Sequence, residues 1–289
     1  MRPVSYTWDN AMVEGRRRLA LLEHSLDPST FRRLEGIGVA PGWRCLDVGA
    51  GGGTVCEWLC RRVAPTGHVT AIELDARFLR SLDLANFDVR EENVVDADLP
   101  PAMFDLVHTR WTLMHIPERE RVLQKLVDCL APGGTLFVEE PDGISVRTLD
   151  RSGFRSLCLR VFGIIQSRGS HPAWGRDLPF KMTSLGLGNV RAEGETPYFR
   201  GASELAEFWQ ISVGARARCG RSNGNGYHAM GSRTGGARRS HATVREPDDD
   251  RRHRDESLTL TCAIIASVPR TRPRLAAPAR TCSRAPCLT

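Results

Sequence analysis

The chain alternates between short apolar runs of strand length and stretches in which apolar residues recur at helical spacing. Between residues 10 and 35 the helical spacing is interrupted by Asp27-Pro28, so we expect an N-terminal cap of two helices joined by a turn. Further helices are expected at 55–63 and 118–130. Short apolar runs predict strands at 44–48, 68–72, 87–90, 104–108 and 135–139. Strands that alternate with helices are typical of an α/β fold, here a three-layer αβα sandwich with a Rossmann-like, mostly parallel sheet.

The second half of the chain predicts an insertion and two more strands. Residues 148–187 have helical spacing, and we expect a helical insertion over the ligand-binding edge of the sheet. Strands are expected at 189–194 and, as a last edge strand beyond a long polar stretch, at 258–268. Five apolar residues of the insertion fit a lid for a hydrophobic ligand and fit ordinary core packing equally well: Phe154, Phe162, Trp174, Phe180 and Met182.

Charge and composition change abruptly after residue 213. The whole chain has a net charge of +6, yet residues 1–213 carry −3 and residues 214–289 carry +9. Residues 214–256 contain no Leu, Ile, Phe or Trp, and such a stretch buries too little apolar surface to offset the entropy of ordering it. We therefore expect four parts: the cap at 1–36, the main domain at 37–213, a disordered low-complexity segment at 214–257, and a last strand with a basic tail at 258–289.

Several partner and compartment classes are disfavoured. Tyr227 is the single aromatic residue of the low-complexity segment, so we expect no nucleic-acid partner. No apolar run approaches 18 residues and no apolar segment precedes the N-terminal arginines, so we expect neither a membrane span nor a signal peptide, and a cytoplasmic protein. The nine cysteines form no C-x-x-C pair, which favours reduced thiols, and we expect no metal site.

The first predicted strand runs directly into a glycine-rich turn. The segment from Asp47 to Thr54 reads D-V-G-A-G-G-G-T, and ligands of open α/β sheets bind at such turns, outside the carboxyl ends of the strands. Thr54 and Cys56 stand where a dinucleotide fingerprint requires its last glycine in either register. Because Asp47 would repel a pyrophosphate, the turn favours a cationic ligand.

Two further polar residues follow the next strands. Glu73 ends the second strand about twenty residues after the turn, where an acid can accept hydrogen bonds from a ribose diol. Asn93 follows the third strand and offers a polar side chain to an adenine edge. Together with the glycine turn these residues describe a site for a nucleoside with a positively charged tail.

With these motifs the chain resembles the class I S-adenosylmethionine-dependent methyltransferases, in particular the small-molecule group of the ubiquinone/menaquinone biosynthesis type. The resemblance covers residues 36–142 and rests on LDVGAGGGT, VTAIELD, FDLVHTRWTLMHIP and LAPGGTLFVEE. It implies a seven-stranded sheet and S-adenosyl-L-methionine as the cofactor. The positions that match the family's cofactor-binding residues are Asp47, Gly49, Gly51, Gly53, Glu73 and Asn93. Asn93 departs from the Asp that is usual in the family and lacks its charge.

The candidates for catalysis lie near the ends of the fourth and fifth strands. Methyl transfer from a sulfonium mostly requires alignment, and a base contributes where the acceptor is a hydroxyl. His115 and Glu140 are the candidate catalytic residues. His115 is alternatively a structural histidine at the Pro117 turn, and Glu140 a solvated strand end. His108 is a candidate cofactor contact, with a buried core histidine as the alternative reading.

We therefore expect an enzyme, a methyltransferase that acts on a small apolar or aromatic organic acceptor. The Asn/Asp-Pro-Pro-Tyr/Phe loop of the family's branches that methylate nitrogen on nucleic acid or glutamine is absent after the fourth strand, which disfavours an exocyclic-amine substrate. Two alternatives stay open. One is a nicotinamide-dependent oxidoreductase. The other is a non-catalytic or decayed cofactor-binding protein with an out-of-frame or degenerate C-terminus, because 38 of the 40 basic residues are Arg.

Overall fold

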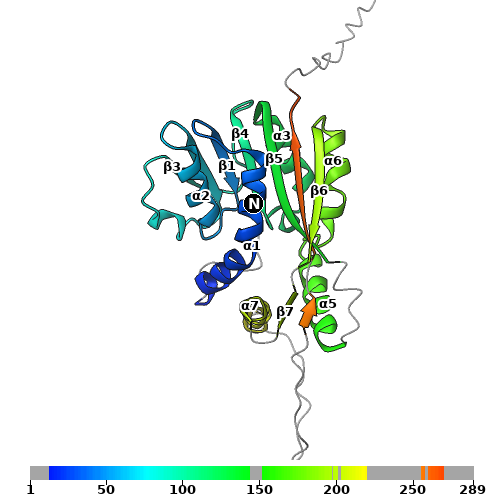
Figure 1. Cartoon of the computed structure of the whole chain (residues 1–289). Helices are drawn as coiled ribbons and strands as arrows, with labels where there is room; N and C mark the ends of the chain where they lie inside the picture. The colour runs from blue at the N-terminus through cyan, green and yellow to red at the C-terminus, as the bar shows by residue number, and fades with distance from the viewer. Residues whose placement is uncertain are drawn as a thin grey trace, which may run out of the picture.

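The computed structural model describes residues 13–143, 152–196, 198–200, 203–219, 255–257 and 260–269. Within these residues seven strands form one sheet (Figure 1): β1 (Arg44–Val48), β2 (His68–Glu73), β3 (Phe87–Glu91), β4 (Phe104–Arg110), β5 (Leu130–Asp142), β6 (Gly188–Glu195) and β9 (Leu260–Ser267). Their order across the sheet is β3-β2-β1-β4-β5-β9-β6. The strands β1 to β5 are parallel, and β9 is antiparallel to both of its neighbours. The predicted seven-stranded, mostly parallel sheet is confirmed.

Helices cover both faces of this sheet. The described helices are α1 (Gly15–Ile37), α2 (Thr54–Val63), α3 (Arg119–Asp128), α5 (Ser152–Gln166), α6 (Leu178–Ser184) and α7 (Glu204–Cys219). Successive strand residues point to opposite faces: Cys45 and Leu106 pack with α1 and α2, whereas Leu46 and Val107 pack with α3 and α6. This arrangement confirms the three-layer αβα sandwich. The remaining elements are short: η1 (Leu79–Ser81), η2 (Leu113–His115), η3 (Trp174–Arg176), β7 (Tyr198–Arg200) and β8 (Asp255–Ser257).

A third apolar cluster lies apart from the two faces of the sheet. It draws on α1, η2, α5 and α7, and its buried members are Leu21, Met114, Cys158, Val161, Phe162, Ile165, Phe208 and Trp209. Figure 1 shows α5 and α7 beyond the carboxyl ends of the parallel strands. Arg17 of α1 also donates two hydrogen bonds to the Glu207 carboxylate of α7, at 2.9 and 2.8 Å. Segments from both ends of the chain therefore cover the ligand edge together.

The N-terminal cap corrects the prediction of two helices. A single helix, α1, runs from Gly15 to Ile37 with Pro28 inside it. A proline removes one helical hydrogen bond. Leu21 before the proline and Leu34 after it are both buried, each in a different apolar cluster. The helix continues because burying both flanks contributes more than the one lost hydrogen bond costs.

The C-terminal strand lies inside the sheet and not at its edge. β9 pairs with β5 from Thr135 to Asp142 on one side and with β6 on the other, so β6 is the edge strand. Ile264 and Ala266 are completely buried. The strand predicted at 258–268 is therefore present, and its interior position, next to the edge strand β6, corrects the expectation of an edge strand. Because β6 pairs only with β9 within the sheet, this strand is needed to attach β6.

The predicted disordered segment, 214–257, differs from the structure at both ends. Helix α7 extends to Cys219, because Ala and Arg are good helix formers and continue it beyond Gly214. At the other end β8 pairs with β7 in a small antiparallel sheet. Residues 220–254 lie outside the described residues, and their disorder stays a prediction.

Truncating one buried side chain of β9 tests its place in the fold. We expect Ile264→Ala to lower the free energy of unfolding by about 2–5 kcal/mol, the usual cost of such a cavity. Ile265→Ala is the matched control, because Ile265 is only partly buried and its pairing with β5 and β6 is backbone pairing. Its cost should be smaller. Urea denaturation of the full chain measures both, and an Ile264→Ala variant as stable as wild type contradicts an interior β9.

Candidate cofactor and acceptor site

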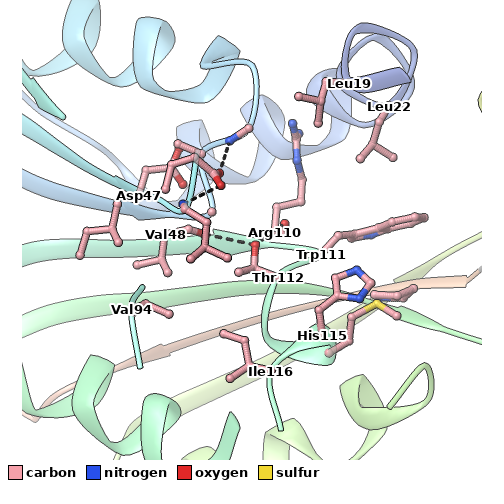
Figure 2. A pocket seen from close by; sticks show the side chains of 18 of the residues that line it. Leu19, Leu22, Asp47, Val48, Val94, Arg110, Trp111, Thr112, His115 and Ile116 are labelled. Carbon is pink, nitrogen blue, oxygen red and sulfur yellow. Dashed lines mark hydrogen bonds between the residues drawn. The ribbon is translucent and has the colours of Figure 1, made fainter. Parts of the chain in front are cut away.

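A pocket lies at the carboxyl ends of β1, β2 and β4, beneath α1, α5 and α7 (Figure 2). One wall consists of the glycine turn and the ends of β2 and β3, with Glu73, Asn93 and Val94 among its residues. The opposite wall is formed by η2 and the three covering helices and is mainly apolar. The pocket therefore has a polar, turn-lined half and an apolar half that meet at the end of β4.

The glycine turn is held in place by its neighbours. Gly49 has a left-handed φ of 72°, and its N–H donates to the carbonyl of Ile72 at 2.8 Å. A Cβ on Gly49 would lie 2.7 Å from Cγ2 of Thr112, a distance that real Cβ atoms do not reach. Gly49 and Gly51 line the pocket as predicted, together with Gly52. Gly53 does not: it precedes α2 with a φ of 95° and packs against Leu82, so its role is in the backbone turn.

Glu73 stands at the pocket wall with its carboxylate against the turn. It accepts hydrogen bonds from the N–H of Gly51 at 3.0 Å and of Leu74 at 2.9 Å. Burial raises the pKa of Glu73, and the backbone N–H groups oppose this rise because they stabilise the ionised form. A carboxylate fixed in this way keeps lone pairs for the hydroxyls of a ligand.

Asn93 also lines the pocket, beside Val94 and Val95. Its Oδ1 accepts a hydrogen bond from the N–H of Val95 at 3.0 Å, so the side chain shapes its own loop. A carbonyl oxygen has two lone pairs, and one remains for a ligand. With Ile72 on the other side, this part of the wall is an apolar slot with one amide at its edge.

Asp47 and His108 form a buried chain under the turn. Nδ1 of His108 lies 2.8 Å from Oδ1 of Asp47, and its Nε2 lies 3.4 Å from Oε2 of Glu139. Cys56 donates its thiol proton to Oδ2 of Asp47 at 3.2 Å, and Thr30 of α1 donates to Glu139 at 2.7 Å. Asp47, His108 and Glu139 are each about 98–99% buried. Asp47 and His108 touch the pocket floor, yet their polar atoms bond to other atoms of the protein. His108 therefore fits the alternative of a buried core histidine better than that of a cofactor contact.

The charge of His108 follows from its two carboxylate neighbours. Burial alone lowers the pKa of an imidazole, but Asp47 and Glu139 outweigh that effect and raise the pKa of His108 to about 9. The pKa of Glu139 is lowered, because the contact with His108 outweighs its burial. The chain is therefore a buried imidazolium between two carboxylates near neutral pH.

Glu140 supports the site from behind the wall. It is completely buried, and its two oxygens accept hydrogen bonds from the N–H of Leu113 at 2.8 Å and of Met114 at 3.3 Å. It is absent from the residues that line the pocket. Burial raises the pKa of Glu140 to about 8. These contacts correct the prediction of a catalytic Glu140, because the carboxyl holds η2 in place and does not face a ligand.

His115 ends η2 and does face the pocket. Figure 2 shows its ring beside Trp111 in the apolar half, and its Nδ1 lies 3.4 Å from the hydroxyl of Ser170. Trp111 lines the same half in a left-handed conformation, with a φ of 52°, and its ring meets that of Phe208 edge to face at 6.2 Å. Of the two predicted catalytic residues, the structure thus places one at the pocket.

Sequence reasoning missed the contribution of the covering helices α1 and α7. The pocket residues that they supply are Arg18, Leu19, Leu22, Glu23, Phe208, Trp209 and Ser212. The helical spacing of α1 indicated a cap but not which face meets the ligand. Of the five proposed lid residues, Phe162 lines the pocket, whereas Trp174 and Met182 belong to the sheet core and Phe180 is 77% exposed. The side chain of Phe154 lies outside the described residues.

The comparison with known proteins agrees with this geometry. Residues 46–138 match the family described as "Methyltransferase domain". This stretch is similar to class I S-adenosylmethionine-dependent methyltransferase domains. The finding favours the predicted methyltransferase over the nicotinamide-dependent oxidoreductase. The cofactor that such a domain implies is S-adenosylmethionine, and the described residues fit it: Gly49 and Gly51 of the turn line the pocket, and the Glu73 carboxylate is fixed beside them.

Individual relatives match parts of this chain. The methyltransferase str3 of Strobilurus tenacellus is 27% identical over 179 residues, 61% of this chain and 61% of its own length. The ubiquinone biosynthesis O-methyltransferase of Xanthomonas campestris pv. campestris is 34% identical over 122 residues, 40% of this chain and 50% of its own length. The chain thus spans between half and about three fifths of the length of these relatives.

The likeness in fold extends further along the chain. Phosphoethanolamine N-methyltransferase 2 of Haemonchus contortus, solved with S-adenosyl-L-methionine, superposes with a TM-score of 0.50 at 14% identity and covers 88% of this chain and 52% of its own. None of the described helices is both long and apolar enough to cross a membrane. Within the described residues, no three His, Cys, Asp or Glu side chains gather as a metal site.

Replacing the Glu140 carboxyl by an amide tests its positioning role. We expect Glu140→Gln to lower the free energy of unfolding by about 1–3 kcal/mol. The two carboxyl oxygens each accept from a different backbone N–H, whereas a glutamine has one oxygen and would place its N–H₂ against the second N–H. Glu57→Gln, on the surface of α2, is the control and should cost far less. Urea denaturation measures both. Equal stability of the Glu140→Gln variant and wild type contradicts this role.

The buried imidazolium predicts how the stability of the folded chain depends on pH. His108 has a folded-state pKa of about 9 and a reference value of 6.5, so the folded state holds a proton that the unfolded state has released. This stabilisation is complete below pH 6.5 and is lost as the pH rises through about 9. The pKa of Glu140, which burial raises to about 8, changes the stability in the same direction. The free energy of unfolding should fall from pH 6.5 to 8.5. A rise over that interval contradicts the charged chain.

Proposed function

We propose that the chain transfers a methyl group from S-adenosylmethionine to a small apolar or aromatic organic acceptor. The observation that carries this proposal is that the glycine turn, with Glu73 beside it, and an aromatic wall line one pocket. When bound, S-adenosylmethionine supplies a methyl group on a positively charged sulfur. The chain's own residues must hold the cofactor, align the acceptor and keep water away, and alignment alone can lower the barrier by about 7–11 kcal/mol.

The polar half of the pocket suits the nucleoside part of the cofactor. The Glu73 carboxylate, fixed by two backbone N–H groups, would accept hydrogen bonds from the ribose hydroxyls. Ile72, Val94 and Val95 would hold the adenine ring, with Asn93 at its edge. Gly49 and Gly51 allow the ligand to approach the backbone, and the buried negative charge of Asp47 lies under the turn. His108 orients Asp47 and does not itself bond to the cofactor in this proposal.

The apolar half suits the acceptor. Trp111, Phe162, Phe208 and Trp209 present aromatic surface there, and such pockets select apolar and aromatic ligands while a few polar groups fix their orientation. The buried indole N–H of Trp111 has no hydrogen-bond partner among the described residues. A buried donor of this kind favours an acceptor that carries an oxygen or nitrogen atom next to its apolar body.

His115 is the residue that we propose for proton transfer. It faces the apolar half, and an imidazole has an unperturbed pKa near 6.5, suited to accepting a proton from an acceptor hydroxyl near neutral pH. Ser170 lies at its Nδ1 and orients the ring. Glu140 contributes indirectly, because it fixes the backbone of the short helix that carries His115.

Calorimetry with S-adenosylhomocysteine tests the cofactor assignment. We expect wild type to bind this product and Glu73→Ala to lose about 1–3 kcal/mol of binding free energy, the cost of leaving buried polar partners unpaired. Asp88→Ala on β3 is the control, because its carboxylate is 73% exposed and pairs with His68. Equal affinities for wild type and Glu73→Ala remove the ribose assignment. No binding by folded wild type at millimolar concentration overturns the proposed function.

A further inference from the structure

We propose that Glu23 of helix α1 binds the α-ammonium group at the amino-acid end of S-adenosylmethionine. This inference rests on the proposed function and assigns to the N-terminal helix a part of the same site. Nothing in the sequence motifs points to Glu23, because it lies outside the stretch that matches the methyltransferase family.

The Glu23 carboxyl lies directly over the glycine turn. Glu23 is 94% buried and lines the pocket. A Cβ built on Gly52 would overlap both the Glu23 carboxylate and the Arg16 guanidinium. Arg16 also donates from Nη1 to the Gly52 carbonyl at 3.1 Å. The ends of two α1 side chains are thus packed against the turn at Gly52.

Glu23 and Glu73 flank adjacent residues of this turn. Glu73 accepts a hydrogen bond from Gly51, and Glu23 stands at Gly52. A ligand that places ribose hydroxyls at Glu73 and passes over the turn brings its far end toward Glu23. In S-adenosylmethionine that far end is an amino acid with an ammonium group, whose charge is opposite to that of the Glu23 carboxylate.

Among the described residues, no basic side chain forms a direct salt bridge with the Glu23 carboxylate. Arg16 and Arg110 lie near enough to act on its charge, but each donates to another acceptor: Arg110 to Asp27 at 2.8 Å, and Arg16 to the Gly52 carbonyl at 3.1 Å. Burying a carboxylate that is not directly paired is costly. An ammonium group of the ligand would offset this cost. The ligand should therefore bind more tightly when Glu23 is ionised.

The titration of Glu23 agrees with this geometry. Burial is the largest cause and raises its pKa to about 7, while Arg110, Arg16 and the N–H of Gly52 lower it and Asp27 raises it. These are the charged groups that face Glu23: Arg16 and Asp27 from its own helix, and Arg110 from β4. Glu23 is therefore partly protonated at neutral pH and loses its proton when a cation binds beside it.

Two ligands that differ only at the amino-acid end isolate this contact. S-adenosylhomocysteine carries the amino acid, and 5′-methylthioadenosine lacks it but keeps the nucleoside and the sulfur. We expect Glu23→Gln in the full chain to weaken S-adenosylhomocysteine by at least about tenfold, the scale for a hydrogen bond to a charged group, and to leave 5′-methylthioadenosine within about twofold. Glu35→Gln, an exposed carboxyl further along α1, is the control and should change neither.

Each outcome of this calorimetric comparison has one reading. Equal binding of S-adenosylhomocysteine by wild type and Glu23→Gln overturns the inference, and so does an equal loss for both ligands, because that loss would report a disturbed nucleoside site. Folded wild type that binds neither ligand overturns the proposed function itself.

The pH dependence of ligand binding gives a second test, and in wild type this test does not depend on the stability of a variant. In wild type the ratio of the two affinities, S-adenosylhomocysteine over 5′-methylthioadenosine, should rise from pH 6 to pH 8 as Glu23 ionises. Taking the ratio removes the effects of groups near the nucleoside. In Glu23→Gln the ratio should stay constant. A constant ratio in wild type contradicts the role of Glu23.

Discussion

The buried chain of Asp47, His108 and Glu139 is the constraint on which the rest of the site depends. It ties β1, β4 and β5 together below the glycine turn, and Thr30 and Arg33 attach α1 to its far end at 2.7 and 3.2 Å from Glu139. Three ionisable groups with almost no solvent contact are tolerable only if each has its partners. The position of α1 over the pocket and the position of the turn are therefore set by one set of contacts.

The carboxylates of the site divide into two groups by what they touch. Asp47, Glu139 and Glu140 bind protein atoms and are almost completely buried, although Asp47 also touches the pocket floor. Glu73 and Glu23 line the pocket on either side of the glycine turn. This division explains how an acidic site stays stable: the first group is neutralised by His108, Arg33 and backbone N–H groups, and the second is left for a cationic nucleoside.

The sequence predicted the fold well and also the position of the glycine turn and Glu73 at one pocket, whereas their contacts with a nucleoside stay a prediction. The strands from 44 to 139 and the glycine turn lie close together along the chain, and their apolar pattern and glycines are local signals. Glu73 and Gly49 could be placed because the carboxyl ends of parallel strands meet at one edge. Glu140 was misassigned because the two faces of a strand end cannot be told apart without knowing that η2 folds back on it.

What could not be predicted depends on contacts between segments distant in sequence. Glu23 and Phe208 reach the pocket only because α1 and α7 pack together over it, and no local pattern encodes that pairing. The unbroken α1 across Pro28 and the interior place of β9 have the same origin, since burial on both sides decided each. The strand at 260–267 also shows that the chain beyond the low-complexity segment belongs to the fold, which disfavours an aberrant C-terminus there.

A crystal structure of the full chain soaked with S-adenosylhomocysteine tests the central claim most directly. The account predicts ribose hydroxyls within hydrogen-bond distance of Glu73, and an amino-acid end between Gly52 and α1. Ligand density elsewhere on the molecule, or an empty pocket in well-ordered crystals at millimolar ligand, would contradict it.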